Sequence, residues 1–127
     1  MAHRSRLAGF IIDSQSDDLD ASAKFWSSAL GVAIADPDSG GTGQYAEFGG
    51  APGDLHVEVQ KVEHPSRVHL DIETDDIPAE VARLEKLGAT VDKRLERWVV
   101  MKAPSGQRFC VVRVQRDGFD EDSNSWA

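Results

Sequence analysis

The stretch VHLDIETDDIPAEVARLEKLGAT, residues 68–90, decides the fold because a strand, a helix start and a helix end follow one another in it. Alternating polar and apolar residues over 68–73 predict a strand. The Asp-Asp pair that follows offers carboxylates to cap the free N–H groups of a helix start. Apolar residues recur at helical spacing over 77–87, and Gly88 supplies the positive φ that ends many helices. The stretch predicts a strand joined to an amphipathic helix.

The same order occurs earlier in the chain. Residues 7–13 form an apolar, β-branched run that predicts a strand, and an Asp-Asp pair again precedes a predicted helix, over 19–30. Phe25 and Trp26 are expected to anchor this helix to a sheet.

Each predicted helix is followed by three short segments of strand-like composition, separated by turns rich in Gly, Pro and Asp. They cover 32–35, 44–48 and 55–62 in the first half, and 89–93, 98–102 and 108–114 in the second. Each half therefore reads βαβββ, and the two halves, about 7–62 and 67–114, are interpreted as an internal duplication.

One βαβββ half leaves a sheet with one bare face, so two halves are expected to pack together. The predicted fold class is α+β, with two βαβββ repeats whose curved mixed sheets form a cleft and whose helices lie on the outer face. A chain of 127 residues with 40% apolar residues is expected to form one domain, over 1–114. Residues 115–127 are interpreted as a solvated acidic C-terminal tail, which Phe119 and Trp126 could tie to a partner subunit.

Composition argues against several classes of partner. The formal net charge is −8 and the basic residues are scattered among acids, so nucleic acid is not expected to bind. The apolar runs are too short to cross a membrane, and residues 1–6 precede no apolar segment of a secretory signal, so a cytoplasmic location is the expectation. Cys110 is the single cysteine, which excludes an intrachain disulfide and a multi-cysteine metal site.

His69 and Asp71 lie on the polar face of the predicted strand 68–73. His69 could act as a general base or orient a ligand, with Asp71 orienting its ring, because an unperturbed histidine titrates near neutral pH. The alternative is a hydrogen-bonded histidine in a wet groove.

His56, Glu58 and Gln60 share one face of the predicted strand 55–62 by the same alternation. His56 and Glu58 could complete an acid/base pair with His69. The alternative is a pair of polar side chains that face solvent.

Tyr45, Phe48 and Trp98 could form flat aromatic walls for a ligand, although core packing would explain them equally well. Cys110 could be a soft metal ligand or a nucleophile if a cation stabilised its thiolate. It could also be a small buried apolar residue between Phe109 and Val111.

A family resemblance is carried by four segments: Phe25-Trp26 with Ala29-Leu30-Gly31, the run Arg67 to Asp76, the helix end Leu84 to Ala89, and Ala103 to Val112. With these the chain resembles the vicinal-oxygen-chelate superfamily, which includes glyoxalase I, bleomycin-resistance proteins and extradiol dioxygenases. The resemblance covers about Leu7 to Val114 and is greatest to the glyoxalase-like subgroup with Phe-Trp in the first helix.

The resemblance implies where a metal would bind. Metal-dependent members place one ligand on the first strand and one on the last strand of each half, usually His or Gln first and Glu last. His69 matches the first-strand histidine of the second half, and the matching position of the first half falls within Ala8–Phe10, where no side chain offers a ligand. The last-strand glutamate of the second half falls at or beside Cys110.

The remaining ligand position could be filled by His56, Glu58 or Gln60. If a divalent iron, nickel, zinc or manganese ion binds, its ligands would be His69 with Glu58 or Gln60. Two side chains seldom hold a catalytic ion alone, so the depleted set predicts a site without a metal cofactor.

Three functions are consistent with these features. The first is a metal-independent glyoxalase-like protein that binds or sequesters an apolar or aromatic small molecule. The second is a metal-dependent lyase or isomerase, similar to lactoylglutathione lyase, or an extradiol dioxygenase, with His69 and Glu58 as catalytic groups. The third is a non-catalytic module that dimerises or regulates, and the resemblance implies a homodimer in each case.

Overall fold

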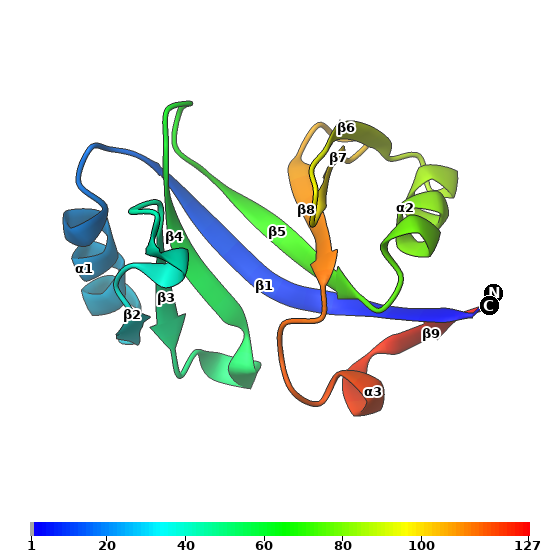
Figure 1. Cartoon of the computed structure of the whole chain (residues 1–127), viewed down its shortest axis with the longest axis horizontal. Coiled ribbons are helices and arrows are strands. Elements are labelled where there is room, and N and C mark those ends of the chain that lie inside the picture. The colour runs from blue at the N-terminus through cyan, green and yellow to red at the C-terminus, as the bar shows by residue number, and fades with distance from the viewer. Residues whose placement is uncertain (1) are drawn as a thin grey trace. The chain divides into compact units, whose positions relative to one another are not determined.

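The computed structural model describes residues 2–127, which divide into two compact units. The N-terminal unit is Gly9–Val68, and the C-terminal unit joins the residues up to Ala8 to His69–Ala127. Each unit combines a helix with a mixed sheet, and each helix follows the first strand of its repeat (Figure 1). The α+β class and the two-fold repetition of βαβββ are confirmed.

The N-terminal unit contains a sheet with the strand order β2-β3-β4-β1. β1 runs parallel to β4, whereas β3 is antiparallel to both β2 and β4. The elements are β1 (His3–Gln15, entering this unit at Gly9), α1 (Leu19–Leu30), β2 (Ala33–Asp36), the short 3₁₀ turns Ser39–Gly41 and Pro52–Asp54, β3 (Tyr45–Gly49) and β4 (His56–Val62).

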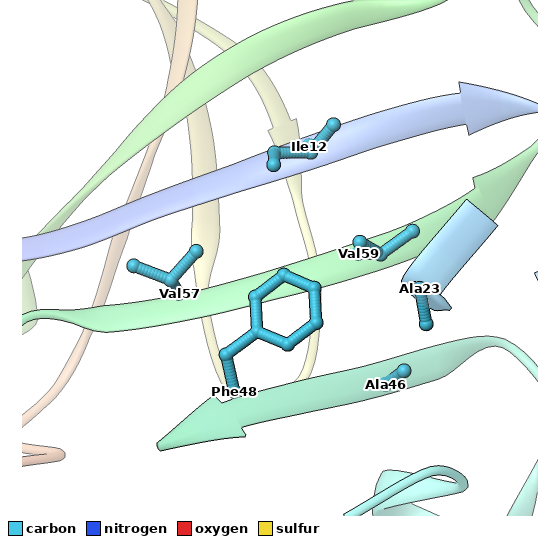
Figure 2. Close-up of a cluster of buried hydrophobic side chains, with 6 residues drawn as sticks. All are labelled: Ile12, Ala23, Ala46, Phe48, Val57 and Val59. Carbon is cyan, nitrogen blue, oxygen red and sulfur yellow. The ribbon is translucent and has the colours of Figure 1, made fainter. Parts of the chain in front are cut away.

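The core of this unit lies between the sheet and α1. Strand alternation turns every second side chain toward the helix. Figure 2 shows the resulting cluster, in which Phe48 of β3 lies among side chains from β1, β4 and α1. Its buried members are Ile12, Ala23, Ala46, Phe48, Val57 and Val59. The opposite face of the sheet carries the polar residues of β3 and β4.

Helix α1 begins and ends as the sequence predicts. The Asp18 carboxylate accepts a hydrogen bond from the Ala21 backbone N–H at 3.0 Å, and Gly31 closes the helix with φ 70°. Trp26 packs against the core, but Phe25 is 61% exposed, and among the described residues its ring contact is a T-shaped one with Trp26. The expectation that both rings anchor the helix is therefore wrong for Phe25, since its neighbour occupies the side facing the sheet.

The C-terminal unit repeats the arrangement with the strand order β5-β8-β7-β6, in which β5 and β8 are parallel. The elements are β5 (Arg67–Thr74, entering this unit at His69), α2 (Ile77–Lys86), β6 (Thr90–Arg94), β7 (Val99–Lys102), β8 (Arg108–Arg113), α3 (Phe119–Asp122) and β9 (Asn124–Trp126). Asp76 caps α2 by accepting from the Ala79 N–H at 3.0 Å, as Asp18 caps α1.

Two apolar clusters lie on opposite sides of this second sheet. The cluster under α2 contains Val81, Leu84, Ala89, Val99, Met101 and Val111. The second, smaller cluster contains Ala8, Cys110 and Val112, with Trp98 and Val100 packed against it. Of the apolar residues of β5, Ile72 packs under α2 as expected, but Leu70 is 52% exposed and Val68 58% exposed.

Residues 115–127 are not the solvated tail that their acidic composition suggested. They form α3 and β9, and β9 pairs antiparallel with the start of β1, where His3 lies opposite Trp126 (Figure 1). Phe119 is 7% exposed, and the Trp126 ring stacks on the Arg83 guanidinium with its centroid 3.9 Å away. The contacts of Phe119 and Trp126 and the pairing of β9 with β1 stabilise an ordered segment, and its acidic side chains remain exposed.

No helix within residues 2–127 is long and apolar enough to span a membrane.

Candidate functional site

The polar face of β4 carries the predicted residues of the N-terminal unit. Val57 and Val59 point into the core, so His56, Glu58 and Gln60 all lie on the opposite face, as the alternation predicted. His56 Nε2 donates a hydrogen bond to Glu58 Oε1 at 2.8 Å. Both side chains are shielded, with exposed fractions of 17% and 13%, so the alternative of freely solvated side chains does not describe them.

Glu47 joins this pair from the neighbouring strand. It lies directly opposite Glu58 in the β3–β4 ladder, and one ligand atom each from Glu47, His56 and Glu58 lies within 4.8 Å of the other two. Sequence reasoning missed Glu47, although the alternation of β3 around Phe48 would have placed it on the polar face. The cluster offers two carboxylates and an imidazole for acid–base chemistry or for binding a cation.

The predicted aromatic walls are only partly formed. Tyr45 lies opposite Gln60 on the polar face and is half-buried. Phe48 is 4% exposed within the core under α1, so its assignment to a ligand wall is wrong and core packing accounts for it. Trp98 is half-buried against the cluster of Ala8 and its neighbours, on the face of its sheet away from α2.

Asp13 of β1 is a further buried carboxylate of the N-terminal unit, and the sequence does not predict it as a site residue. Asp13 is 2% exposed and lies opposite Gln60 in the β1–β4 ladder. Arg67 Nε lies 3.6 Å from Asp13 Oδ2. Asp13 is the last residue of the predicted strand 7–13, and a polar residue at the end of a strand usually faces solvent. The sequence therefore gives no sign that Asp13 is buried.

The C-terminal unit brings His69, Asp71 and Cys110 together. Asp71 and Cys110 are paired residues of β5 and β8, and one ligand atom from each of the three residues lies within 4.8 Å of the other two. His69 Nε2 lies 3.5 Å from Asp71 Oδ1, so the carboxylate is placed to orient the imidazole. Asp71 and Cys110 are buried, at 6% and 9% exposure.

Glu73 lies on the same face of β5 as His69 and Asp71, but its contacts are structural. Its fully buried carboxylate accepts from Arg6 Nε at 2.8 Å, from Arg116 Nε at 2.9 Å and from the Gln115 N–H at 2.6 Å. Burial raises the pKa of Glu73, but the hydrogen bonds from Gln115, Arg6 and Arg116 together outweigh burial and hold its pKa below the ordinary value. The group is therefore a buried carboxylate held in its charged form.

Glu80 of α2 is a second carboxylate of this kind. It accepts from Arg83 Nε and Nη2, each at 2.8 Å, and from His3 Nε2 at 2.8 Å. Burial again raises its pKa, and bonds from Arg83, His3 and Ser5 lower it below the ordinary value.

The strands β1 and β4 approach each other closely within Ala8–Phe10, the stretch where the family resemblance places a first-strand metal ligand. Gly9 pairs with His56 in the parallel β1–β4 ladder. A Cβ on Gly9 would fall 1.8 Å from the His56 carbonyl oxygen, so this place has no room for a side chain.

The protein consists of two βαβββ repeats. In each repeat a helix covers one face of the sheet, and polar side chains, including a histidine, lie on the other face. Residues 9–112 match the family model of the glyoxalase-like domain. The chain belongs to this family, and with it to the glyoxalase/bleomycin-resistance/dioxygenase superfamily.

Solved structures share the fold at low sequence identity. A hypothetical protein of Bacillus halodurans C-125 is 12% identical with a TM-score of 0.61, covering 90% of this chain and 97% of its own. Methylmalonyl-CoA epimerase of Mycobacterium tuberculosis is 15% identical with a TM-score of 0.56, covering 87% of this chain and 88% of its own. No curated protein sequence matches the chain.

The four metal positions of the family do not fit these residues. The resemblance places the first-strand donor of the first repeat within Ala8–Phe10, and none of these three side chains offers a donor. At Gly9 the carbonyl oxygen of His56 also leaves no space for a side chain. In the second repeat, Cys110 lies at or beside the position that the resemblance gives to a glutamate.

Proposed function

We propose that this protein is a glyoxalase-like small-molecule-binding protein that holds its ligand without the metal centre of the metal-dependent members. The observation that carries the proposal is the close approach of β1 and β4 at Gly9, which leaves no room for a side chain there. Gly9 lies within Ala8–Phe10, the stretch where the resemblance places a metal ligand. A binding function needs only convergent polar groups on a shielded surface.

Both units supply such groups on the faces of their sheets away from the helices. His56, bonded to Glu58, and His69, beside Asp71, can donate to or accept from a ligand, since an imidazole does either. Tyr45 and Trp98 add flat apolar surface next to them, which favours an apolar or aromatic ligand with a few polar substituents.

The test is native mass spectrometry of the purified protein before and after removal of divalent metals with a chelator, combined with elemental analysis. An organic adduct that survives chelation and is lost in His69→Ala or Glu58→Gln is the expected result. Gln115→Ala is a matched control, because its side chain is exposed and belongs to neither cluster, and its backbone N–H still donates to Glu73 in the variant.

Two outcomes would instead favour an enzyme. Loss of the adduct on chelation, or turnover that requires iron, nickel, zinc or manganese, would indicate a metal-dependent lyase, isomerase or dioxygenase. In that case His69→Ala must abolish turnover, since His69 is the first-strand group with a side chain able to act.

We also propose that the protein forms a homodimer in the cytoplasm, as the family resemblance implies. Light scattering of the purified chain tests the assembly, and a monomeric mass at all concentrations would contradict it.

A further inference from the structure

Positive charge is concentrated in one part of the C-terminal unit. Five of the fourteen basic residues lie within 92–108, a segment that contains most of β6, all of β7 and the start of β8. The same segment holds two acids, Asp92 and Glu96, so its formal charge is +3 in a chain whose net charge is −8. A local excess of this sign favours an anionic partner.

Three of these cations, Lys93, Lys102 and Arg108, share one face of the sheet. Lys102 pairs with Arg108 in the antiparallel β7–β8 ladder, and Lys93 pairs with Val100 in the β6–β7 ladder. Val100 packs against the cluster that contains Cys110, on the side of the sheet away from α2. Since paired residues share a face and alternate residues of a strand return to it, all three cations lie on that side.

The three positive charges are compensated in part. Arg108 Nε donates to Asp92 Oδ2 at 3.0 Å, and Asp92 lies at the register irregularity of β6 beside Lys93. Lys93 and Lys102 make no hydrogen bond or ion pair with the described residues. Like charges directly opposite each other on paired strands repel. An anion held between Lys102 and Arg108 would turn this repulsion into attraction to a common partner.

Apolar surface adjoins the cations on the same face. Val100 lies two residues before Lys102, and Trp98 two residues earlier again, directly before β7. Both are half-buried and pack against the same apolar cluster. At about 3.3 Å per residue, the Cα atoms of Lys102 and Trp98 lie up to about 13 Å apart. An aromatic molecule with an anionic end matches this succession of surfaces.

We propose that Lys102 and Arg108, with Lys93 beside them, bind the carboxylate or phosphate group of a small organic anion whose apolar body lies over Val100 and Trp98. The inference rests on the proposed function, because it names the charge of the small molecule that the protein binds. The Arg108 guanidinium offers a planar set of donors that suits either anion, and the lysine ammonium groups add point charges.

Isothermal titration calorimetry with three naphthalene probes tests the charge preference. The full-length protein, treated with a chelator, is titrated with 2-naphthoate, 2-naphthyl phosphate and the neutral 2-naphthamide, in a low-salt buffer without phosphate or carboxylate. At least one anion should bind about fivefold more tightly than the amide, the gain expected from a solvent-accessible ion pair. The more tightly bound anion identifies the group, and its advantage should shrink in about 0.5 M salt because the charges are screened.

Variants locate the preference on the protein. Lys102→Gln and Arg108→Gln should each remove most of the advantage of the anion without weakening the binding of the amide. Asp92→Asn should tighten anion binding about twofold, because it removes the carboxylate that competes for Arg108. Arg94→Gln is the matched control, since this exposed cation of β6 pairs with Val99, which lies under α2. Circular dichroism melts establish that each variant is folded.

Three results would overturn the inference. They are equal affinity for the three probes, binding of none of them, and an anion preference that persists in Lys102→Gln and Arg108→Gln but is lost in Arg94→Gln.

Failure of the proposed function would look different. Equal binding of the probes by the chelated protein agrees with metal-free binding and removes the anion site alone. An anion preference that depends on Lys102 and Arg108, in protein whose native adduct is lost on chelation, supports the anion site and contradicts metal-free binding.

Discussion

Gly9 and His56 are paired residues of the parallel strands β1 and β4, and a Cβ on Gly9 would lie 1.8 Å from the His56 carbonyl oxygen. Real Cβ atoms do not approach backbone atoms this closely, so the glycine is required by the packing of the two backbones. Gly9 lies within Ala8–Phe10, the stretch where the family resemblance places a metal ligand, and its position is thereby closed to every side chain. This steric constraint supports the proposal of a site without the family's metal centre.

Gly9→Ala should destabilise the protein by at least about 3 kcal/mol, because the added methyl group must push β1 away from β4. Urea unfolding at neutral pH measures the free energy of unfolding. Gly49→Ala is the matched control, since the added Cβ would meet only the Ala35 side chain at 3.2 Å and alanine favours a strand over glycine. Equal stability of Gly9→Ala and the wild type would show that the two strands separate easily.

The two helix caps should contribute similarly to the free energy of unfolding. Asp18 and Asp76 each accept a hydrogen bond at 3.0 Å from the backbone N–H three residues later. Asp18→Ala and Asp76→Ala should each lower the free energy of unfolding by about 1 kcal/mol, and asparagine at either position should retain most of it. Thermal melts of the alanine and asparagine variants provide the comparison. A loss in Asp→Asn as large as in Asp→Ala would mean that charge, and not capping, matters.

Trp126 should fasten the C-terminal segment to the unit. Its Nε1 donates to Ser5 Oγ at 2.8 Å while its ring covers Arg83. Trp126→Ala should cost about 2 kcal/mol, half from the hydrogen bond and half from the cation–π contact. Trp126→Phe should recover the second half, and hydrogen exchange at His3–Ser5 should speed up in the alanine variant. Unchanged exchange there would contradict a fastening role.

The sequence predicts the repeated order of strands and helices because that order depends on local signals: alternation, Asp caps and closing glycines. It also predicts which residues of β4 share a face, since alternation has a period of two. Alternation alone does not tell which face of β3 meets α1. The sequence therefore does not show that Phe48 belongs to the core and that Glu47 lies on the polar face.

Other features depend on contacts between distant residues, which periodicity does not reveal. The acidic composition of 115–127 indicates solvation, but the pairing of β9 with β1 depends on partners more than a hundred residues away. The role of Glu73 likewise depends on Arg6 and Arg116, which are far from it in sequence. Cys110 could be located by the family resemblance, but its grouping with Asp71 appears only in the strand register.

The buried Glu73 should make the free energy of unfolding depend on pH below about 4.5, the ordinary glutamate pKa. Because its pKa is lowered in the folded protein, unfolding takes up a proton, and the stabilisation present above that pH is lost as pH falls through the folded pKa. Glu80 shifts in the same direction and should add to the loss. Glu73→Gln should cost about 3 kcal/mol at pH 7, since it leaves Arg6 and Arg116 buried without the charge that they bind.

Urea unfolding at intervals from pH 7 to pH 3 tests this dependence. The free energy of unfolding of the wild type should fall steeply below about pH 4.5. That of Glu73→Gln should be lower at pH 7 but fall less with pH, because residue 73 no longer takes up a proton on unfolding. Glu96→Gln, at an exposed turn, should follow the wild-type curve. Parallel curves for wild type and Glu73→Gln would mean that Glu73 has the same pKa in the folded and unfolded chains, against the arginine and backbone hydrogen bonds that hold its charge.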